Sequence, residues 1–266
     1  MRKLSIDEVK QYQIQIFQAV ASFCEEHHIS YWIDCGSLIG TIRHGGYIPW
    51  DDDIDIGMLR PDFERMKREF NLSNERFRFS CVDMDEDSFT PYGKVFDTTT
   101  VLYEPNENGY KSCINVDIFV YDNAPDDEHA LKKMYDRRNF YQLMERFQHH
   151  GVSDYGKWYR KMILEPLYLL TNLFPKNYFV KKISDNAKKY SDKRTKRVGN
   201  FTSGTSMSCD RSVFDSFVEK KFENITVRVP SGYDRWLTSF YGNYMELPPE
   251  EKRVSHHHFI AYTIGE

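Results

Sequence analysis

The sequence has little of what marks secreted, membrane-spanning or nucleic-acid-binding proteins. Its five cysteines are scattered and odd in number, and none forms a CxxC pair, so neither a disulfide framework nor a zinc ribbon is indicated. The N-terminus has no apolar signal core. A net charge of -4 gives no reason to expect a nucleic-acid partner. With 40% hydrophobic and 29% charged residues, we expect a reduced, cytoplasmic globular protein.

Long apolar runs are also scarce. The most lipid-like run, Met162–Phe174, contains Glu165 and Pro166 and is too short to span a bilayer. It predicts a buried helix rather than a helix at a membrane surface. The next segment, Lys176–Arg197, has nine Lys or Arg against two acidic residues. That segment is either a solvated helical face or a contact surface for an anionic acceptor or for membrane phosphates.

Two common classes of catalytic motif are missing. No Walker A sequence occurs, and no candidate nucleophile lies in a Ser-His-Asp or Cys-His pattern. A P-loop enzyme and a covalent hydrolase are therefore not indicated, and the chemistry must be sought among other polar residues.

The apolar periodicity predicts a single α+β domain, with a mixed β-sheet core flanked by helices and a helical elaboration at about 126–200. No internal repeat or low-complexity linker interrupts it. Helices are predicted at about 6–27, 36–43, 61–70, 128–149, 155–173, 178–189 and 233–241. Strands are predicted at about 31–34, 53–58, 77–81, 92–96, 99–103, 113–119 and 225–229.

Aspartates are concentrated at one point of the chain, where four fall within five residues. The apolar alternation over Ile54–Met58 predicts a half-buried strand, on which Asp51, Asp53 and Asp55 would line one face. Carboxylates this close repel one another unless a cation lies between them, and hard oxygen ligands suit Mg²⁺ or Mn²⁺. We therefore predict a metal site here, with an acidic solvated loop as the alternative.

Gly36 and Ser37 follow a short predicted strand and open a predicted helix. Backbone N–H groups at a helix start attract phosphate, and glycine allows the phosphate to approach closely. This pair alone is a weak signal, but it lies just upstream of the aspartates. We therefore predict that Gly36 and Ser37 bind substrate phosphate.

Three further residues are candidates for the same site. Asp117 lies between apolar residues of another predicted strand, which could place it beside the metal pair. It is predicted as a third metal ligand or as the base that takes a proton from an attacking hydroxyl. Arg43 and Lys94 are predicted to stabilise phosphate charge, because an inward lysine is costly without an anionic partner. The alternatives are a polar strand residue and two ordinary surface cations.

The last candidates are adjacent histidines near the C-terminus. His256, His257 and His258 cannot all face one site, and no other residues have the spacing of zinc ligands. We predict that His256 or His257 reaches a phosphate or a leaving group, with a structural or surface role as the alternative.

The assembled pattern predicts a reaction class. Carboxylate-held metals can bridge a phosphoanhydride, orient an attacking hydroxyl and neutralise the leaving phosphate. Direct in-line transfer between two bound substrates is favoured over a covalent intermediate.

These residues resemble the LicD family of phosphotransferases. The matching stretches are ordered and spread over about 31 to 258, whereas about 126 to 220 contributes little. They are Tyr31–His44 followed by Gly46–Ile56, Tyr92–Val95 leading to Val116–Phe119, and Tyr241–Met245 leading to Leu247–Arg253 and His256-His257.

The resemblance implies a nucleotidyltransferase-like core at about 28–125 plus 221–260, within one LicD-like domain over 1–266. It implies Mg²⁺-dependent transfer of a phospho-alcohol, typically phosphocholine from CDP-choline. The implied acceptor is a sugar hydroxyl of a glycan or lipid-linked glycan precursor, such as teichoic acid, lipopolysaccharide or capsule. A peripheral contact with the inner membrane surface would then be expected.

The resemblance also carries roles to individual positions. Gly36 and Ser37 match the turn at the nucleotide phosphates, although the usual hydrophobic-Gly-Thr opening here begins with Cys35. The other matches are Asp53 and Asp55 for the metal pair with Asp51 beside them, Asp117 for the third carboxylate, and Arg43, Lys94, His256 and His257 for recurrent polar positions.

Two other functions fit the same residues. A nucleotidyltransferase using an NTP would release pyrophosphate, whereas a CDP-linked donor would release CMP. A non-catalytic metal- or nucleotide-binding module would release neither. Choline, ethanolamine, glycerol and ribitol donors would all leave the phosphate-binding residues unchanged.

Overall fold

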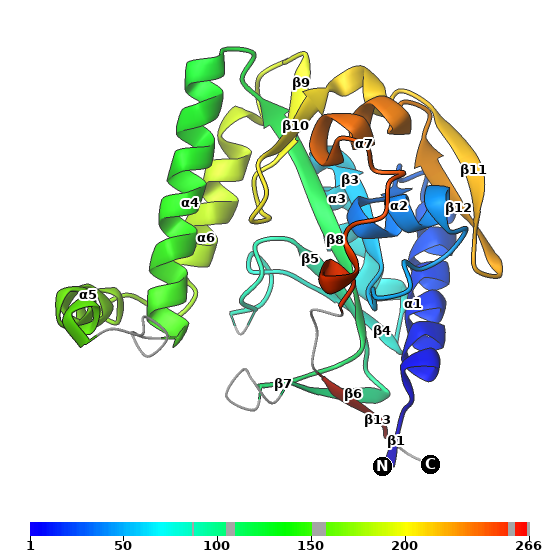
Figure 1. Ribbon diagram of the computed structural model, residues 1–266, viewed down its shortest axis with the longest axis horizontal. Coiled ribbons are helices and arrows are strands. Elements are labelled where there is room, and N and C mark those ends of the chain that lie inside the picture. The colour runs from blue at the N-terminus through cyan, green and yellow to red at the C-terminus, as the bar shows by residue number, and fades with distance from the viewer. Residues whose placement is uncertain (87, 105–109, 151–157, 255–258, 265–266) are drawn as a thin grey trace. The chain divides into compact units, whose positions relative to one another are not determined.

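The computed structural model describes residues 1–86, 88–104, 110–150, 158–254 and 259–264 (Figure 1). The chain divides into two compact units. Unit 1 consists of Met1–Ser80, Gly93–Val120 and Cys209–Glu266, and unit 2 consists of Cys81–Tyr92 and Tyr121–Ser208. Both units contain helices and strands, which confirms the predicted α+β class.

The main sheet of unit 1 has the strand order β2–β3–β8–β5–β4. Antiparallel pairs join β2 to β3, β5 to β8 and β4 to β5. The strands are β2 (Trp32–Ile33), β3 (Asp55–Leu59), β4 (Phe77–Ser80), β5 (Gly93–Asp97) and β8 (Asn115–Ala124). The first residues of β8 pair with β5, and its last residues belong to unit 2, where they pair with β9.

Smaller elements complete the strands of unit 1. A four-stranded antiparallel sheet has the order β1–β13–β6–β7, and β11 and β12 form a separate antiparallel pair. These strands are β1 (Arg2–Lys3), β6 (Thr100–Glu104), β7 (Tyr110–Ser112), β11 (Phe217–Phe222), β12 (Ile225–Pro230) and β13 (Ile260–Thr263).

The described residues of unit 1 form four α-helices, and two of them start at residues that favour a helix start. α1 (Ile6–Glu26) begins with a capping box, in which the Ser5 hydroxyl accepts from the Glu8 N–H and the Glu8 carboxylate accepts from the Ser5 N–H. α3 (Arg60–Ser73) has a proline in its first turn. The others are α2 (Cys35–Arg43) and α7 (Tyr233–Tyr241).

Strand β3 lies in the centre of the unit 1 sheet, between β2 and β8, and contacts both α2 and α3. Every residue from Asp55 to Met58 is buried, so the strand is buried on both faces and not half-buried as predicted. Gly57 is required here, because a Cβ at this position would lie 2.4 Å from Cε2 of the Trp32 indole. The Trp32 ring in turn stacks on Phe214 with centroids 4.1 Å apart.

Unit 2 is mainly helical. In it, α4 (Glu128–His150) and α6 (Tyr178–Ala187) lie side by side (Figure 1), with Leu131, Met134 and Ala187 in their shared core. Unit 2 also contains α5 (Trp158–Thr171), β9 (Arg197–Asn200), the first half of β10 (Met207–Asp210) and a short 3-10 helix at Lys188–Tyr190. Two more 3-10 helices, Arg211–Phe214 and Glu250–Lys252, are described in unit 1.

The predicted helix near Met162–Phe174 exists as α5, but the expectation that it is buried is wrong for its outer residues. Leu169, Leu170 and Leu173 are among the most exposed large apolar side chains of the described residues. Apolar composition alone cannot distinguish a buried helix from one that presents leucines to its surroundings. Among the described residues, no helix combines the length and apolar character needed to cross a membrane.

Candidate active site

The candidate site lies within unit 1, around the start of β3. Asp55 is the first residue of this strand and is only 7% exposed. Asp51 and Asp53 precede the strand, so the prediction that all three aspartates share one strand face is wrong. Asp34 is fully buried at the end of β2, and its N–H donates to the Asp55 carbonyl at 2.9 Å. The β2–β3 pairing therefore holds two acidic residues next to each other.

The Ser37 hydroxyl fixes the path of the chain through the aspartates. It accepts a hydrogen bond from the Asp55 N–H at 3.0 Å and donates to the Asp53 carbonyl at 3.3 Å. Ser37 is buried in the first turn of α2. The structure thus gives Ser37 a positioning role for Asp53 and Asp55, while its predicted phosphate contact stays a prediction.

Gly36 lies against Asp51. A Cβ at position 36 would come within 2.8 Å of Asp51 Oδ2, so the missing side chain makes room for the carboxylate. Before it stands Cys35, a non-glycine residue with a φ of 46°, which costs conformational energy and is typical of functional sites. The chain is therefore tightly constrained where α2 begins beside the aspartates.

Asp117 reaches the same region from β8. Its N–H donates to the Ile54 carbonyl at 3.1 Å, which places the β8 residue beside the start of β3. Lys94 is its direct cross-strand partner on β5, and the Lys94 Nζ lies 2.5 Å from Asp117 Oδ1 and 3.1 Å from Asn115 Oδ1. The anionic partner of Lys94 within the protein is therefore Asp117, and the predicted contact of Lys94 with substrate phosphate stays a prediction.

The electrostatics show that the acidic side chains converge. Burial raises the pKa of the Asp55 carboxyl well above its ordinary value, and the charges of Asp53, Asp117, Asp34 and Asp51 raise it further. Burial and the same neighbouring acids raise the pKa of the Cys35 thiol. Cys35 therefore stays protonated near neutral pH, which argues against a thiolate nucleophile.

The donor set fits a hard divalent cation by its chemistry. Carboxylate oxygens are the preferred ligands of Mg²⁺ and Mn²⁺, and a cation would relieve the repulsion that raises the pKa of Asp55. Within the described ranges, no three His, Cys, Asp or Glu side chains are already close enough together to hold an ion. Ion binding would therefore have to draw the carboxylates closer than they stand here.

Two arginines lie near Trp50, the residue that directly precedes Asp51. The Arg43 Nη1 donates to the carbonyls of Tyr244 at 2.7 Å and Glu246 at 3.2 Å, which ties the end of α2 to the chain after α7. Arg253 stacks on the Trp50 ring, with its guanidinium carbon 5.8 Å from the centroid. Burial lowers the pKa of Arg43, and the Arg253 charge lowers it further. Two cations that repel each other form a site suited to an anion.

Tyr47 and Tyr241 both lie within range of the acidic charges, and of these two Tyr47 is buried. Tyr241, the last residue of α7, is 44% exposed. Burial raises the pKa of its phenol, and the neighbouring groups that raise it further are Cys35, Asp34, Asp55 and Asp51. An open aromatic ring beside carboxylates is a suitable surface for an organic cation.

The structure thus brings most of the predicted residues into one region: Gly36, Ser37, Arg43, Asp51, Asp53, Asp55, Lys94 and Asp117. His256 and His257 lie outside the described residues, so their predicted role is untested.

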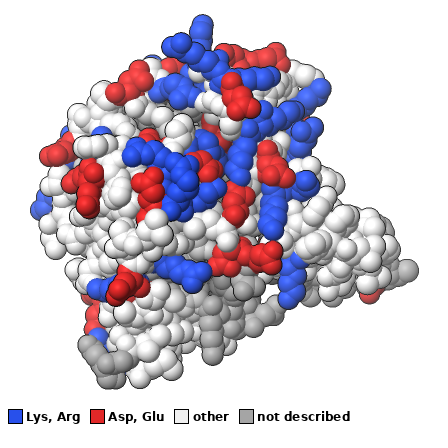
Figure 2. Space-filling model, turned by 180° about the vertical axis from the view of Figure 1, so that it is seen from behind, with Lys and Arg blue, Asp and Glu red and all other residues white. Residues whose placement is uncertain are grey.

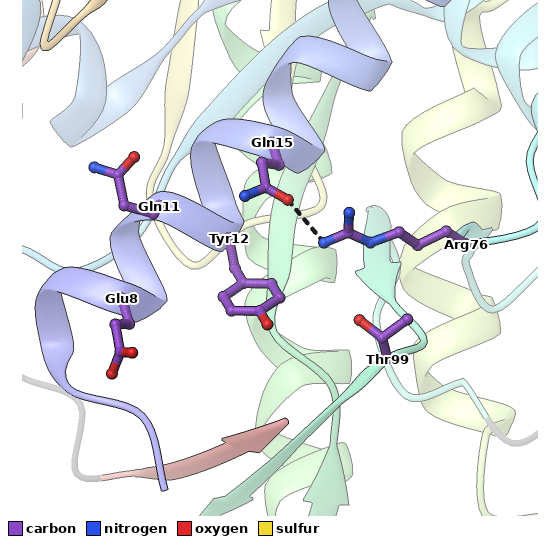
Figure 3. A pocket seen from close by; sticks show the side chains of 6 residues that line it. All are labelled: Glu8, Gln11, Tyr12, Gln15, Arg76 and Thr99. Atoms are coloured by element: carbon purple, nitrogen blue, oxygen red, sulfur yellow. Dashed lines mark hydrogen bonds between the residues drawn. The ribbon is translucent and has the colours of Figure 1, made fainter. Parts of the chain in front are cut away.

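A separate cavity of about 460 Å³ lies beside α1 (Figure 3). Its lining includes Tyr12 and Gln15 of α1, Arg76 and Thr99, and the Arg76 Nη2 donates to Gln15 Oε1 at 2.8 Å. None of its lining residues belongs to the acidic region. Arg76 is neutralised by the buried Asp97 at 2.6 Å, so the cavity offers no free charge for a phosphate.

Comparison with known proteins decides the family. Residues 28–153 match the family described as LicD/FKTN/FKRP, nucleotidyltransferase domain. The chain is 31% identical to lipopolysaccharide cholinephosphotransferase LicD of Haemophilus influenzae over 281 aligned residues, which cover 99% of this chain and 100% of that protein. The chain belongs to the LicD family. This confirms the predicted resemblance and the prediction that the chain is a LicD-type transferase.

A shorter similarity extends the family to eukaryotes. Ribitol 5-phosphate transferase FKRP of Homo sapiens and of Mus musculus is 44% identical over 43 residues, which cover 16% of this chain and 9% of those proteins. Such a short match says nothing about the rest of either protein.

Sequence reasoning missed four residues of this LicD-family site: Asp34, Trp50, Tyr241 and Arg253. Asp34 had a usable signal, because it directly precedes the Cys35-Gly36-Ser37 turn. Tyr241 and Arg253 lie some 200 residues from the aspartates. Both fall in stretches that resemble the family, but no local pattern marked either one as a candidate site residue.

Proposed function

We propose that this chain transfers phosphocholine from CDP-choline to a sugar hydroxyl of lipopolysaccharide. The observation that carries the proposal is that backbone hydrogen bonds of Asp34 and Asp117, together with the Ser37 hydroxyl, bring Asp34, Asp53 and Asp117 to the buried Asp55. The near full-length relative, a lipopolysaccharide cholinephosphotransferase, supports the choice of donor alcohol and acceptor. Teichoic acid and capsule precursors present similar sugar hydroxyls and are alternative acceptors.

Asp53, Asp55 and Asp117 would hold Mg²⁺ or Mn²⁺, with Asp51 beside them. The ion would supply neutralisation of the charge on the phosphoanhydride oxygens of the donor. Ser37 keeps the backbone of Asp53 and Asp55 in place through its two hydrogen bonds.

The reaction exchanges one phosphorus–oxygen bond for another. The sugar hydroxyl oxygen forms a bond to the choline-bearing phosphorus while the bond from that phosphorus to the bridging oxygen breaks, and CMP leaves with the bonding electrons. Asp117 accepts the hydroxyl proton, and Lys94 compensates the charge of this region. Arg43 and Arg253 stabilise the phosphates of the nucleotide.

Tyr241 is our candidate for contact with the choline group. A quaternary ammonium ion is attracted both by aromatic faces and by carboxylates, and Tyr241 offers a partly open ring within range of the acidic charges. The acceptor would be a glycan or lipid-linked glycan made on the cytoplasmic side, where the chain would touch the inner membrane surface peripherally.

The test is product release by the purified chain. With CDP-choline, Mg²⁺ and a lipopolysaccharide acceptor, we expect CMP and phosphocholine-labelled acceptor in equal amounts. Asp53→Ala and Asp55→Ala should each abolish turnover. Asp136→Asn is the matched control, because this exposed α4 aspartate pairs only with Lys132 among the described residues.

Three outcomes would change the proposal. Pyrophosphate released from an NTP would favour nucleotidyl transfer instead. Full turnover in both Ala variants would remove the site assignment. Turnover with another CDP-alcohol but not with CDP-choline would keep the site and replace the alcohol.

A further inference from the structure

Helix α5 of unit 2 has apolar residues on two faces, and the described residues cover one of them. On the inner face, Leu164 and Leu167 pack against a core that contains Met144, Phe147 and Phe179. A helix that packs on one face normally presents charged or polar residues on the other. Here the opposite face is also rich in leucine.

The outer leucines are highly exposed. Leu169 is 61% exposed, Leu170 is 53% exposed and Leu173, in the turn after the helix, is 78% exposed. Leu169 and Leu170 lie in the last turn of α5, and Leu173 lies two residues beyond the end of the helix. Figure 2 shows this part of unit 2 as a surface with few charged side chains. Exposed apolar side chains gathered in this way mark an interaction surface.

The turn that presents Leu173 is held firmly in place. The Gln148 Nε2 on α4 lies within hydrogen-bond distance of the carbonyls of Thr171, Phe174 and Pro175, at 3.0, 3.0 and 3.2 Å. Phe174 stacks on Tyr178 with centroids 4.6 Å apart. These contacts hold the backbone of the turn that carries Leu173 in one conformation. Less conformational entropy is then lost when the leucines dock.

Positive charge follows directly in the sequence. The segment Lys176–Arg197 contains nine Lys or Arg and two acidic residues, in a chain whose net charge is -4. Some of these cations are paired inside the protein, as Lys182 is with Asp185 and Arg197 with Glu128. The described residues place no ion pair on Lys176 or Lys181. Glu165 is the one acidic residue on the outer face of α5.

We propose that the outer face of α5 with the following basic segment docks on an anionic phospholipid surface. Leucines would enter the boundary between headgroups and acyl chains, and lysines would contact the phosphates. A two-fold dimer through this face would instead bring equal basic segments together, which like-charge repulsion opposes. The inference rests on the proposed membrane contact of the enzyme, but not on the chemistry of transfer.

The test is sedimentation of the full chain with vesicles of phosphatidylcholine alone and of phosphatidylcholine with 30% phosphatidylglycerol. We expect binding to the anionic vesicles, weakened but not abolished by high salt. Leu173→Asp should weaken this binding at least roughly tenfold, because one fully inserted leucine is lost. Leu173→Phe should bind like the parent chain.

Leu72→Asp is the matched control. Leu72 is 85% exposed at the end of α3 in unit 1, so this substitution adds the same charge at an equally open position. It should bind anionic vesicles like the parent chain. Circular dichroism should show both Asp variants folded, as neither leucine packs in a core.

Three results would overturn the proposal. The first is that the parent chain does not bind anionic vesicles, and the second is that Leu173→Asp binds them as well as the parent chain does. The third result is a dimer, seen by light scattering, that Leu173→Asp dissociates while neither protein binds vesicles. Failure of the proposed transfer reaction can be told apart from failure of membrane docking. CDP-choline turnover with a water-soluble acceptor needs no vesicles and should be the same in Leu173→Asp and the parent chain.

Discussion

Lys94 and Asp117 are direct partners across the β5–β8 pair, and their ammonium and carboxylate groups lie 2.5 Å apart. Both side chains are largely sheltered from solvent, at 22% and 17% exposure. Lys94 therefore neutralises the charge of Asp117, whereas the charges of Asp34, Asp51 and Asp53 still act on Asp55. This arrangement sets the charge of the site before any substrate phosphate arrives.

Replacing Lys94 should damage catalysis more than stability. We expect Lys94→Gln to lower kcat/KM for CMP release by roughly 10²–10³, as for loss of one preorganised electrostatic contact. Lys132→Gln removes a comparable but exposed ion pair with Asp136 and should leave the rate unchanged. Equal rates in the two variants would show that Lys94 has no part in the reaction.

Ser37 should matter for both folding and activity. Ser37→Ala leaves the buried Asp55 N–H without its acceptor, which costs about 1–3 kcal/mol in the free energy of unfolding. Urea unfolding measures this loss. Ser239→Ala deletes a hydroxyl that donates to the Trp236 carbonyl inside α7, and it should cost less. A Ser37→Ala chain as stable and as active as the control would contradict the positioning role.

Gly36 should be intolerant of a methyl group. In Gly36→Ala the new Cβ would lie 2.8 Å from Asp51 Oδ2, so the carboxylate must move and the metal site must change with it. We expect a higher Mg²⁺ requirement for CMP release and a small change in melting temperature. Gly204→Ala is the control, since a Cβ there meets nothing within 4 Å. If Gly36→Ala required no more Mg²⁺ for CMP release than the parent chain, the metal-site role given to Asp51 would be refuted.

The raised pKa of Asp55 gives a signed dependence of stability on pH. The folded chain holds this proton at higher pH than the unfolded chain, so the contribution of Asp55 to stability is lost as pH rises through the folded pKa. Without divalent metal, we expect Asp55→Asn to be more stable than the parent at pH 8 by roughly 1–3 kcal/mol. The difference should shrink towards pH 4.

Urea unfolding in a chelator at the two pH values tests this prediction, with Asp136→Asn as the control for loss of an exposed carboxylate. Added Mg²⁺ should then stabilise the parent, by about 2.7 kcal/mol at a hundredfold excess over its Kd, and should leave Asp55→Asn unchanged. A parent that is more stable than Asp55→Asn at pH 8 in chelator would contradict the crowding of charge at Asp55.

Much of the fold was predictable because apolar spacing is a local signal. The helices α1, α4 and α7 match their predicted ranges to within about two residues, and α7 matches in full. Strands β1, β7, β9, β10, β11 and β13 were missed, because they are short or carry polar residues and owe their structure to pairing. The strand predicted from Asp53 begins at Asp55, since Asp53 and Asp51 follow a turn instead.

Most acidic residues of the candidate site and the cations Arg43 and Lys94 could be nominated from the sequence, whereas Arg253 and Tyr241 could not. Asp53, Asp55 and Asp117 could be joined because each neighbours a strand of alternating apolar residues. Arg253 and Tyr241 follow no such pattern, and their nearness to Arg43 and Asp55 is set by the path of the chain after β12. The burial of α5 was mispredicted because a leucine-rich helix has the same composition in a core and on a docking face.

The most direct test of the central claim is a titration of the purified chain with Mn²⁺, followed by electron paramagnetic resonance of the free ion. We expect the parent chain and Asp136→Asn to bind Mn²⁺, with affinity increased by CDP-choline, and Asp53→Asn and Asp55→Asn to lose this binding. Mn²⁺ binding of equal affinity in all four proteins would contradict a metal site at the start of β3.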